Sequence, residues 1–467
     1  MQQSKILVTL GPSTSTPEQI RCLFEAGANA VRINFSHGTH AEHAERIDIV
    51  RSVTAQLGYE TAILGDLCGP KLRVGHFANR CVTLKQGDLF TLTTRDVQGD
   101  ESQVTMSYPL HKDLSFGDRL LLDDGLMSLQ VVQVLTDGLV CRVTVGGVLS
   151  DHKGVNVPGV RLSVPAITEK DEQDIRFGRE VGVDWFALSF VRDAIEVVRC
   201  KALAGDIPVI AKLEKPEAIK HLKSIIEVAD GVMVARGDLG VEMGSEYVPV
   251  AQKQVIQWAN HQGKLVITAT QMLDSMMHNP RPTRAEASDV ANAIFDGSDV
   301  VMLSGETAAG KYPVEAVTMM RAIVEQVEGS EQYRERPNPT VYTDAWASEN
   351  ATARAAATLS RDVKLKAVVV AASGPRWVDV LADYRPQAPI LALVNDVKLA
   401  RRLALQWGML SRVIPTPASQ AVLIAIAEAS AVALLGAQPG DDIAILSPCL
   451  PQQVGHTLTL WKISPVL

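Results

Sequence analysis

The 467-residue sequence predicts an α/β fold, in which a (β/α)8 TIM barrel carries an inserted all-β lid domain and a C-terminal α/β domain. Three observations predict this fold. The chain is too long for one compact core, because a domain usually holds about 100–200 residues. Eight short apolar runs alternate with helix-like segments between residues 5 and 325, and one long β-rich stretch interrupts the alternation. A third region follows the polar, proline-bearing segment 334–344.

The apolar runs are the expected strands of the barrel. They are residues 6–10, 30–35, 62–64, 185–190, 208–213, 231–235, 265–270 and 300–303. Helix-start signals lie between some of them, such as Thr168 before an acidic first turn and Pro216 in a first-turn position. Strands that alternate with helices form a parallel sheet, and eight such units favour a closed barrel. An open, doubly wound sheet is the alternative, but it has no preference for eight strands.

The interruption lies between residues 70 and 164. Its segments 87–94, 119–122, 126–134 and 139–145 are β-branched or alternating, and Gly-Asp pairs separate them. We expect residues 70–164 to form an all-β domain in a βα loop, on the face where barrels carry active sites, and therefore a candidate lid. The barrel then comprises residues 1–69 and 165–335.

The C-terminal region, residues 345–467, predicts a smaller α/β domain. Residues 351–360 have helical character, and 367–371, 390–393 and 442–446 have the pattern of buried strands. We find no internal repeat beyond the alternation of strands and helices.

Composition restricts the function. Hydrophobic residues make up 46% and charged residues 21% of the chain, as in ordinary globular proteins. The net charge of −8 argues against nucleic acid as a partner, which would require a basic face. The N-terminal apolar run stops at Gly11-Pro12 and is too short for a signal peptide or a membrane span. The six cysteines show no zinc-binding spacing, so we expect a cytoplasmic enzyme with reduced thiols.

Polar residues two apart mark the ends of three expected strands. They are Arg32, Asn34 and Ser36 on the second strand, Lys212 and Glu214 on the fifth, and Thr268 and Thr270 on the seventh. Residues two apart on a strand point the same way, and barrel active sites lie at the carboxyl ends of the strands. Because polar groups inside a barrel cost free energy unless a ligand or partner satisfies them, the pattern predicts a functional site.

Glu214 and Asp238 predict a magnesium site. They follow neighbouring strands, which lie about 5 Å apart, so both carboxylates can reach one ion. Two carboxylates with open positions suit Mg²⁺, which keeps waters and accepts substrate oxygens. Alone, such a pair is more often part of a salt-bridge set. Lys212 beside it, with Arg32 and Arg73, favours a metal-and-phosphate site of the kind that phosphoryl transfer uses.

Seven segments follow one another along the chain, six of them at the end of an expected strand. They are Val8-Thr-Leu-Gly-Pro12, Val31-Arg-Ile-Asn-Phe-Ser-His-Gly38, Val209-Ile-Ala-Lys-Leu-Glu-Lys-Pro216, Met233-Val-Ala-Arg-Gly-Asp-Leu-Gly240, Ala269-Thr-Gln-Met272, Pro282-Thr-Arg-Ala-Glu286 and Met302-Leu-Ser-Gly-Glu-Thr307. Together they resemble the pyruvate kinase family over essentially the whole chain. The resemblance implies a glycolytic enzyme that makes pyruvate and ATP from phosphoenolpyruvate and ADP, with Mg²⁺ or Mn²⁺. It also implies a C-terminal regulatory domain for a phosphorylated allosteric effector, and a homotetramer.

The resemblance also implies a role for each site residue. The implied catalytic residues are Lys212, Thr270, Arg32 and Arg73. The implied phosphoenolpyruvate contacts are Arg32, Lys212, Gly237, Asp238 and Thr270. The implied nucleotide contacts are Asn34, His37, Arg73 and the lid residue Lys153, and the implied Mg²⁺ ligands are Glu214 and Asp238. The proton donor to the enolate stays open, with Thr270 acting through water and Ser304 and Glu306 nearby.

Residues 66–71 depart from many members of that family. Those members need K⁺, which groups matching Asn34, Ser36 and Asp66 bind, and they have Glu where this chain has Lys71. An ammonium in place of a carboxylate adds two units of positive charge, which replaces the charge of K⁺. We therefore predict that no monovalent cation is required; a solvated Lys71 without this role is the alternative.

The loop after the first strand of the C-terminal domain departs as well. Related chains often have a Thr/Ser-rich phosphate loop, whereas this one reads Ala372-Ser-Gly-Pro-Arg-Trp377. Ser373, Gly374 and Arg376 remain as phosphate donors, but hydroxyls are fewer and Pro375 lacks an N–H. A sugar bisphosphate is therefore disfavoured, and a monophosphorylated effector and no effector both stay open.

Two other functions fit part of the pattern. A Mg²⁺-dependent aldolase or lyase of enolate chemistry would share the Lys/Glu/Asp cluster, but neither the lid with Lys153 nor the C-terminal domain. A metabolite sensor without catalytic activity would have lost Lys212, Glu214 or Asp238, and all three are present.

Overall fold

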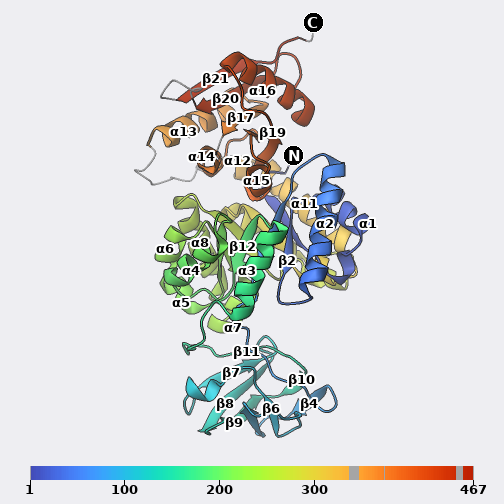
Figure 1. Ribbon diagram of the computed structural model, residues 1–467, viewed down its shortest axis with the longest axis vertical. Coiled ribbons are helices and arrows are strands. Elements are labelled where there is room, and N and C mark those ends of the chain that lie inside the picture. The colour runs from blue at the N-terminus through green and yellow to red at the C-terminus, as the bar shows by residue number, and fades with distance from the viewer. Residues whose placement is uncertain (1, 336–346, 373, 449–455, 466–467) are drawn as a thin grey trace.

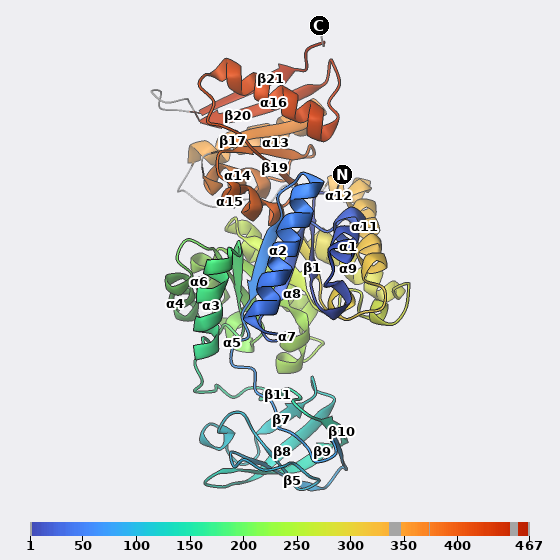
Figure 2. The same ribbon diagram turned by 45° about the vertical axis from the view of Figure 1, so that its right-hand side comes forward.

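The computed structural model describes residues 2–335, 347–372, 374–448 and 456–465. These residues form three bodies along one long axis, with a barrel in the middle. The all-β domain lies beyond one end of the barrel and the C-terminal domain beyond the other (Figures 1 and 2). The barrel thus separates the two additional domains.

Eight parallel strands close the barrel in the order β1-β16-β15-β14-β13-β12-β3-β2. They are β1 (Lys5–Thr9), β2 (Ala30–Asn34), β3 (Ala62–Asp66), β12 (Trp185–Leu188), β13 (Val209–Leu213), β14 (Gly231–Ala235), β15 (Leu265–Ala269) and β16 (Val300–Leu303). Each overlaps one predicted apolar run, so the predicted barrel is confirmed. Seven strands are buried throughout, and β2 is interrupted only by half-buried Arg32 and Asn34. Burial on both faces explains why these strands read as continuous apolar runs.

Helices cover the outside of the barrel. They are α1 (Pro17–Ala26), α2 (His40–Leu57), α3 (Glu169–Val181), α4 (Ala194–Ala204), α5 (Pro216–Lys220), α6 (Leu222–Val228), α7 (Arg236–Met243), α8 (Val248–His261), α9 (Arg284–Asp296), α10 (Gly305–Ala308), α11 (Pro313–Gly329) and α12 (Glu331–Arg334). Helices α1, α2, α3 and α9 each begin at a threonine capping box and end at a glycine with positive φ. No helix in the described part of the chain combines the length and apolar content that crossing a membrane requires.

The inserted domain contains a two-stranded sheet, β10-β4, and a six-stranded sheet, β11-β7-β8-β9-β5-β6. Its strands are β4 (Cys81–Leu84), β5 (Leu89–Thr93), β6 (Gln103–Thr105), β7 (Arg119–Leu122), β8 (Met127–Val134), β9 (Gly138–Val145), β10 (Gly147–Ser150) and β11 (Val155–Asn156). It has its own core around Phe90, Leu120 and Leu129. The predicted β domain is confirmed, although β4, β6, β10 and β11 are too short to give a periodic pattern in the sequence.

The C-terminal domain is built on a five-stranded sheet in the order β19-β18-β17-β20-β21. Its strands are β17 (Ala367–Ala372), β18 (Ile390–Val394), β19 (Met409–Val413), β20 (Asp442–Pro448) and β21 (His456–Lys462), and its helices are α13 (Ala347–Asp362), α14 (Pro375–Asp383), α15 (Val397–Arg402) and α16 (Gln420–Leu435). The predicted α/β domain is confirmed. The edge strands β19 and β21 were not predicted, because their residues are largely half-buried or exposed and carry no apolar run.

The C-terminal domain closes the amino end of the barrel. Leu405 is fully buried in one apolar cluster with inward residues of the strands, such as Leu7. The buried Lys5 ammonium at the start of β1 donates to the Met409 carbonyl at 2.7 Å. The opposite, carboxyl end of the strands faces the inserted domain and stays open for ligands.

Candidate active site

A cavity of about 110 Å³ lies at the carboxyl end of the barrel strands, facing the inserted domain. Among the predicted site residues, it is lined by Arg32, Asn34, Ser36, His37, Asp66, Lys71, Arg73, Lys212, Glu214, Asp238 and Thr270. These residues come from points up to 238 positions apart (Arg32 to Thr270) and meet because the barrel is closed. Gly237 lies next to the cavity, and Lys153 does not line it.

Lys212 is the buried cation at the centre of the site. Its ammonium donates to Ser189 Oγ at 2.6 Å and pairs with Glu214 Oε1 at 3.0 Å and Asp66 Oδ1 at 3.2 Å. Burial alone would lower the pKa of Lys212, but the charges of Asp66 and Glu214 outweigh it and raise this pKa above its ordinary value. Lys212 therefore stays charged, with Ser189 as a hydrogen-bond acceptor and two carboxylates within ion-pair distance.

Asp66, at the end of β3, bridges Lys212 and Arg32. The Nε atom of Arg32 pairs with Asp66 Oδ2 at 2.6 Å, and another guanidinium nitrogen donates to Thr9 Oγ1 at 3.1 Å. Burial would raise the pKa of Asp66, but the two cations lower it below the ordinary value. The buried carboxylate thus fixes two positive groups side by side at one wall of the cavity.

Glu214 and Asp238 are the two carboxylates for which the sequence predicts Mg²⁺. Glu214 is buried and accepts from the Phe190 N–H at 2.7 Å, whereas the Asp238 side chain, in the first turn of α7, is 23% exposed. Burial raises the pKa of Glu214, Lys212 lowers it, and the nearby charge of Asp238 raises it further. A cation between the two carboxylates would relieve this repulsion, and their oxygens are the ligands that Mg²⁺ prefers.

The two carboxylates fit an ion that keeps other ligands. In the ranges that the structure describes, no group of three or more His, Cys, Asp or Glu side chains is arranged to hold a metal. The protein therefore offers Glu214 and Asp238, and water or substrate oxygens would complete the coordination of Mg²⁺.

A strained turn follows β15. Thr270 and Gln271 have φ of 67° and 52°, in the left-handed region that such residues rarely adopt. Thr270 Oγ1 accepts from the Gly237 N–H at 2.8 Å, and the Arg236 guanidinium donates to the Thr270 carbonyl at 2.7 Å. Arg236 also pairs with Asp289. Arg236 thus supports the turn, and the turn presents the Thr270 hydroxyl to the cavity.

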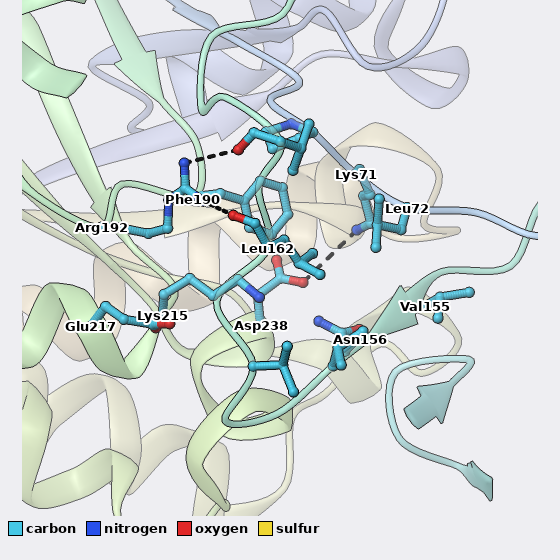
Figure 3. A pocket seen from close by; sticks show the side chains of 14 residues that line it. Lys71, Leu72, Val155, Asn156, Leu162, Phe190, Arg192, Lys215, Glu217 and Asp238 are labelled. Atoms are coloured by element: carbon cyan, nitrogen blue, oxygen red, sulfur yellow. Dashed lines mark hydrogen bonds and ion pairs between the residues drawn. The ribbon is translucent and has the colours of Figure 1, made fainter. Parts of the chain in front are cut away.

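Lys71 enters the site from the strand that leads into the inserted domain. Its Nζ atom lies 3.9 Å from Asp238 Oδ1, and Figure 3 shows the two side chains pointing at each other. Burial, followed by the charges of Arg73, Lys71 and Arg32, lowers the pKa of His37. The ammonium is therefore part of the cavity and acts on its other groups.

The other predicted residues lie close by or outside the cavity. Lys153 pairs with Asp123 of its own domain at 2.8 Å, and the Arg73 guanidinium donates to the His152 carbonyl at 2.9 Å. Asn34 Oδ1 accepts from the Ser36 N–H at 3.1 Å. In the predicted phosphate loop, residues 372–377, Ser373 and the side chain of Arg376 lie outside the part of the chain that the structure describes.

Ser304 and Glu306 line a neighbouring cavity together with Thr270. Burial raises the pKa of Glu306, which accepts from the Leu273 and Ser304 N–H groups at 3.0 and 2.8 Å. The sequence reasoning missed Ser189, which holds Lys212. Ser189 lies inside the apolar run 185–190, where a hydrogen-bonded serine gives no distinct signal.

Comparisons with known proteins agree with this arrangement. The family model described as pyruvate kinase, barrel domain, matches residues 1–317, and the one described as pyruvate kinase, alpha/beta domain, matches residues 350–460. Pyruvate kinase 2 of Synechocystis sp. is 48% identical over 418 residues, which cover 87% of this chain and 70% of that protein. The pyruvate kinase of Clostridium perfringens is 43% identical over 427 residues, covering 88% and 89%. That of Geobacillus stearothermophilus is 42% identical over 464 residues, covering 98% and 79%.

Proposed function

The chain belongs to the pyruvate kinase family of phosphotransferases, and from this premise we propose how its cavity transfers the phosphoryl group of phosphoenolpyruvate to ADP. Mg²⁺ is bound by Glu214 and Asp238, and no K⁺ is required. The observation that carries the proposal is the buried Lys212 ammonium, held between Asp66 and Glu214 beside Arg32. Phosphoryl transfer needs such fixed positive charge, because the protein mainly positions groups and neutralises the migrating phosphoryl.

Arg32 and Lys212 bind the phosphoryl group of the substrate. Arg32, oriented by Asp66 and Thr9, binds the phosphate of phosphoenolpyruvate. Since Lys212 donates to Ser189 and pairs with Glu214 and Asp66, a phosphoryl oxygen has to compete with these partners when it binds. Bound Mg²⁺ would supply the charge that draws the phosphate and carboxylate oxygens together.

Thr270 and the Gly237 N–H face the carboxylate end of the substrate. In the structure they hydrogen-bond to each other, so a carboxylate oxygen can take the place of the hydroxyl as acceptor for the Gly237 N–H. When the enolate of pyruvate has left the phosphoryl group, its C3 needs a proton. We assign Thr270, acting through water, to this step, with Ser304 and Glu306 in the adjoining cavity. Asn34, His37, Arg73 and Lys153 are proposed to face the nucleotide.

The absence of a K⁺ requirement is proposed on the position of Lys71. Its ammonium lies in the cavity that Asn34, Ser36 and Asp66 also line, where related enzymes bind the monovalent cation. A fixed ammonium supplies one positive charge there without the loss of entropy that binding a free ion requires.

The test is pyruvate formation from phosphoenolpyruvate and ADP, measured with Mg²⁺ and with a chelator, in K⁺-free buffer and after K⁺ addition. We expect equal rates with and without K⁺, and none with the chelator. A rate that appears only with K⁺ would remove the role of Lys71 and keep the kinase. Turnover of phosphoenolpyruvate without ADP would instead favour an aldolase or lyase.

We also propose a cytoplasmic homotetramer. The C-terminal domain exposes several apolar side chains, at Val422, Val432 and Leu434 of α16 and at Leu460 of β21. Buried contacts between copies would cover such a surface. For the effector, the alternatives are a monophosphorylated compound and none; titration of monophosphorylated compounds into the activity assay separates them.

A further inference from the structure

A buried carboxylate ties the inserted domain to the helix that carries Asp238. Glu242 lies on α7 four residues after Asp238, and its side chain is 1% exposed. Its Oε1 atom accepts from Asn156 Nδ2 at 2.8 Å and pairs with Lys215 Nζ at 2.6 Å. Asn156 belongs to β11 of the inserted domain, and Lys215 directly follows Glu214. One carboxylate thus joins three segments, two of which carry the proposed Mg²⁺ ligands.

Both connections of the inserted domain reach α7. The outgoing strand brings Lys71 to Asp238, and the returning strand brings Asn156 to Glu242. Positions four apart lie on the same face of a helix, so the domain contacts α7 at two points one turn apart. A movement of the inserted domain therefore acts on the orientation of α7 as well as on its position.

A small pocket lies between these contacts. Figure 3 shows a small pocket with Lys71, Asn156, Lys215 and Asp238 around it. Its volume is about 40 Å³, room for a few waters and too little for a substrate. Apolar walls come from both connections and from Phe190 of the barrel. Because its walls belong to two bodies, the pocket changes shape when they move relative to each other.

Glu242 does not line the cavity that holds Lys212, and it borders the adjoining cavity together with Asp238. Its carboxylate is buried against Asn156 and Lys215, so it acts through other residues. We propose that Glu242 is a positioning residue, which couples docking of the inserted domain to the spacing of Asp238 and Glu214. Asn156 of the inserted domain and Lys215 both contact the buried Glu242 carboxylate. When the inserted domain is docked, these contacts hold the Glu214 and Asp238 carboxylates at metal-binding distance. This inference rests on the proposed function of Glu214 and Asp238 as Mg²⁺ ligands.

The test measures metal binding without turnover. Mn²⁺ is titrated into the full chain, and the unbound ion is followed by electron paramagnetic resonance. We expect Glu242→Gln, which keeps the shape but not the charge, to weaken Mn²⁺ binding about 10-fold, the scale of residues that support metal ligands. Asn156→Ala removes only the lid contact and should weaken binding less. The double variant should bind no more weakly than Glu242→Gln, because Asn156 acts through Glu242.

Asp184→Asn is the matched control. Asp184 is a buried carboxylate that accepts from Arg51 at 2.6 Å and from the Ile63 N–H at 2.8 Å, at the amino ends of the strands. The Asp184→Asn variant should have a lower melting temperature and an unchanged affinity for Mn²⁺. If Glu242→Gln also lowers only the melting temperature, or if the effects of Asn156→Ala and Glu242→Gln add, the inference is wrong. If Asp238→Asn binds Mn²⁺ as tightly as the natural chain, the proposed metal site is wrong and the inference fails with it.

Hydrogen exchange gives a second readout. When Mn²⁺ and phosphoenolpyruvate bind, the amides of β11 should become more protected in the natural chain and in Asp184→Asn, but not in Glu242→Gln. Equal protection in all three proteins would show that docking of the lid does not depend on Glu242.

Discussion

Replacing Lys71 tests the proposed internal cation most directly. The Lys71 ammonium lies 3.9 Å from Asp238 Oδ1, and its side chain is 31% exposed. Two unit charges about 4 Å apart attract by roughly 1 kcal/mol in bulk water and about 4 kcal/mol at an effective dielectric of 20. Since nearly a third of the side chain reaches solvent, screening places the interaction near the lower value, at about 1–2 kcal/mol. A substrate anion bound beside Asp238 experiences Lys71 at a similar distance, so Lys71→Gln should lower kcat/KM about 5- to 30-fold without K⁺.

The assay is initial-rate pyruvate formation coupled to NADH oxidation, with tetramethylammonium as the inert cation and K⁺ added in steps. We expect K⁺ to restore part of the rate of Lys71→Gln. It should restore most of the rate of Lys71→Glu, because this variant places a carboxylate where the ammonium of Lys71 was. Lys71→Arg keeps the charge and serves as the control, with a rate independent of K⁺. The reasoning is refuted if Lys71→Glu turns over at the natural rate in K⁺-free buffer.

Three further predictions concern other parts of the molecule. Lys212→Met should reduce turnover about 10²–10³-fold or more but weaken phosphoenolpyruvate binding far less, by equilibrium dialysis; surviving turnover would remove its assigned role. Burial raises the pKa of Asp379 on α14 to about 7. Because this folded-state pKa lies above that of the unfolded chain, the natural protein loses stability as pH rises from about 4 to 7. Asp379→Asn should therefore be about 4 kcal/mol more stable at pH 8 and gain nothing at pH 4, by urea unfolding; an equal gain at both pH values would contradict this. Leu434→Glu with Leu460→Glu should halve the mass of a tetramer in light scattering, and an unchanged mass would place the interface elsewhere.

The fold was predictable where burial leaves a pattern in the sequence. A strand buried on both faces, such as β13 with Val209–Leu213, must be a continuous apolar run, and eight such runs in alternation with helices predict the barrel. Strand β11 has two residues, and β21 alternates exposed and half-buried residues. A loop or a surface segment could have either pattern, so the sequence did not identify β11 and β21 as strands.

Part of the site was predictable because charged residues stand out in the apolar runs of the barrel strands. Lys212 and Glu214 stand out because charged residues interrupt or follow an apolar run. Ser189 does not stand out, since a serine at a strand end costs little when it hydrogen-bonds, and its contact with Lys212 depends on two strands lying side by side. Glu242 reads as an ordinary helix residue; its buried partners, Lys215 and Asn156, come from two other segments of the chain. The position of Lys153 relative to the nucleotide depends on the placement of the lid and stays a prediction.

The closure of the barrel floor by Leu405 has a consequence for synthesis on the ribosome. The eighth strand, β16, leaves the ribosome long before Leu405 does. Until then, the apolar interior around Leu7 opens to water at the amino ends of the strands. The nascent barrel therefore completes its core with a segment from the next domain, and a gene shortened after α12 would encode a barrel with an uncovered apolar opening. An exchange of the C-terminal domain would therefore have to keep an apolar residue at the position of Leu405.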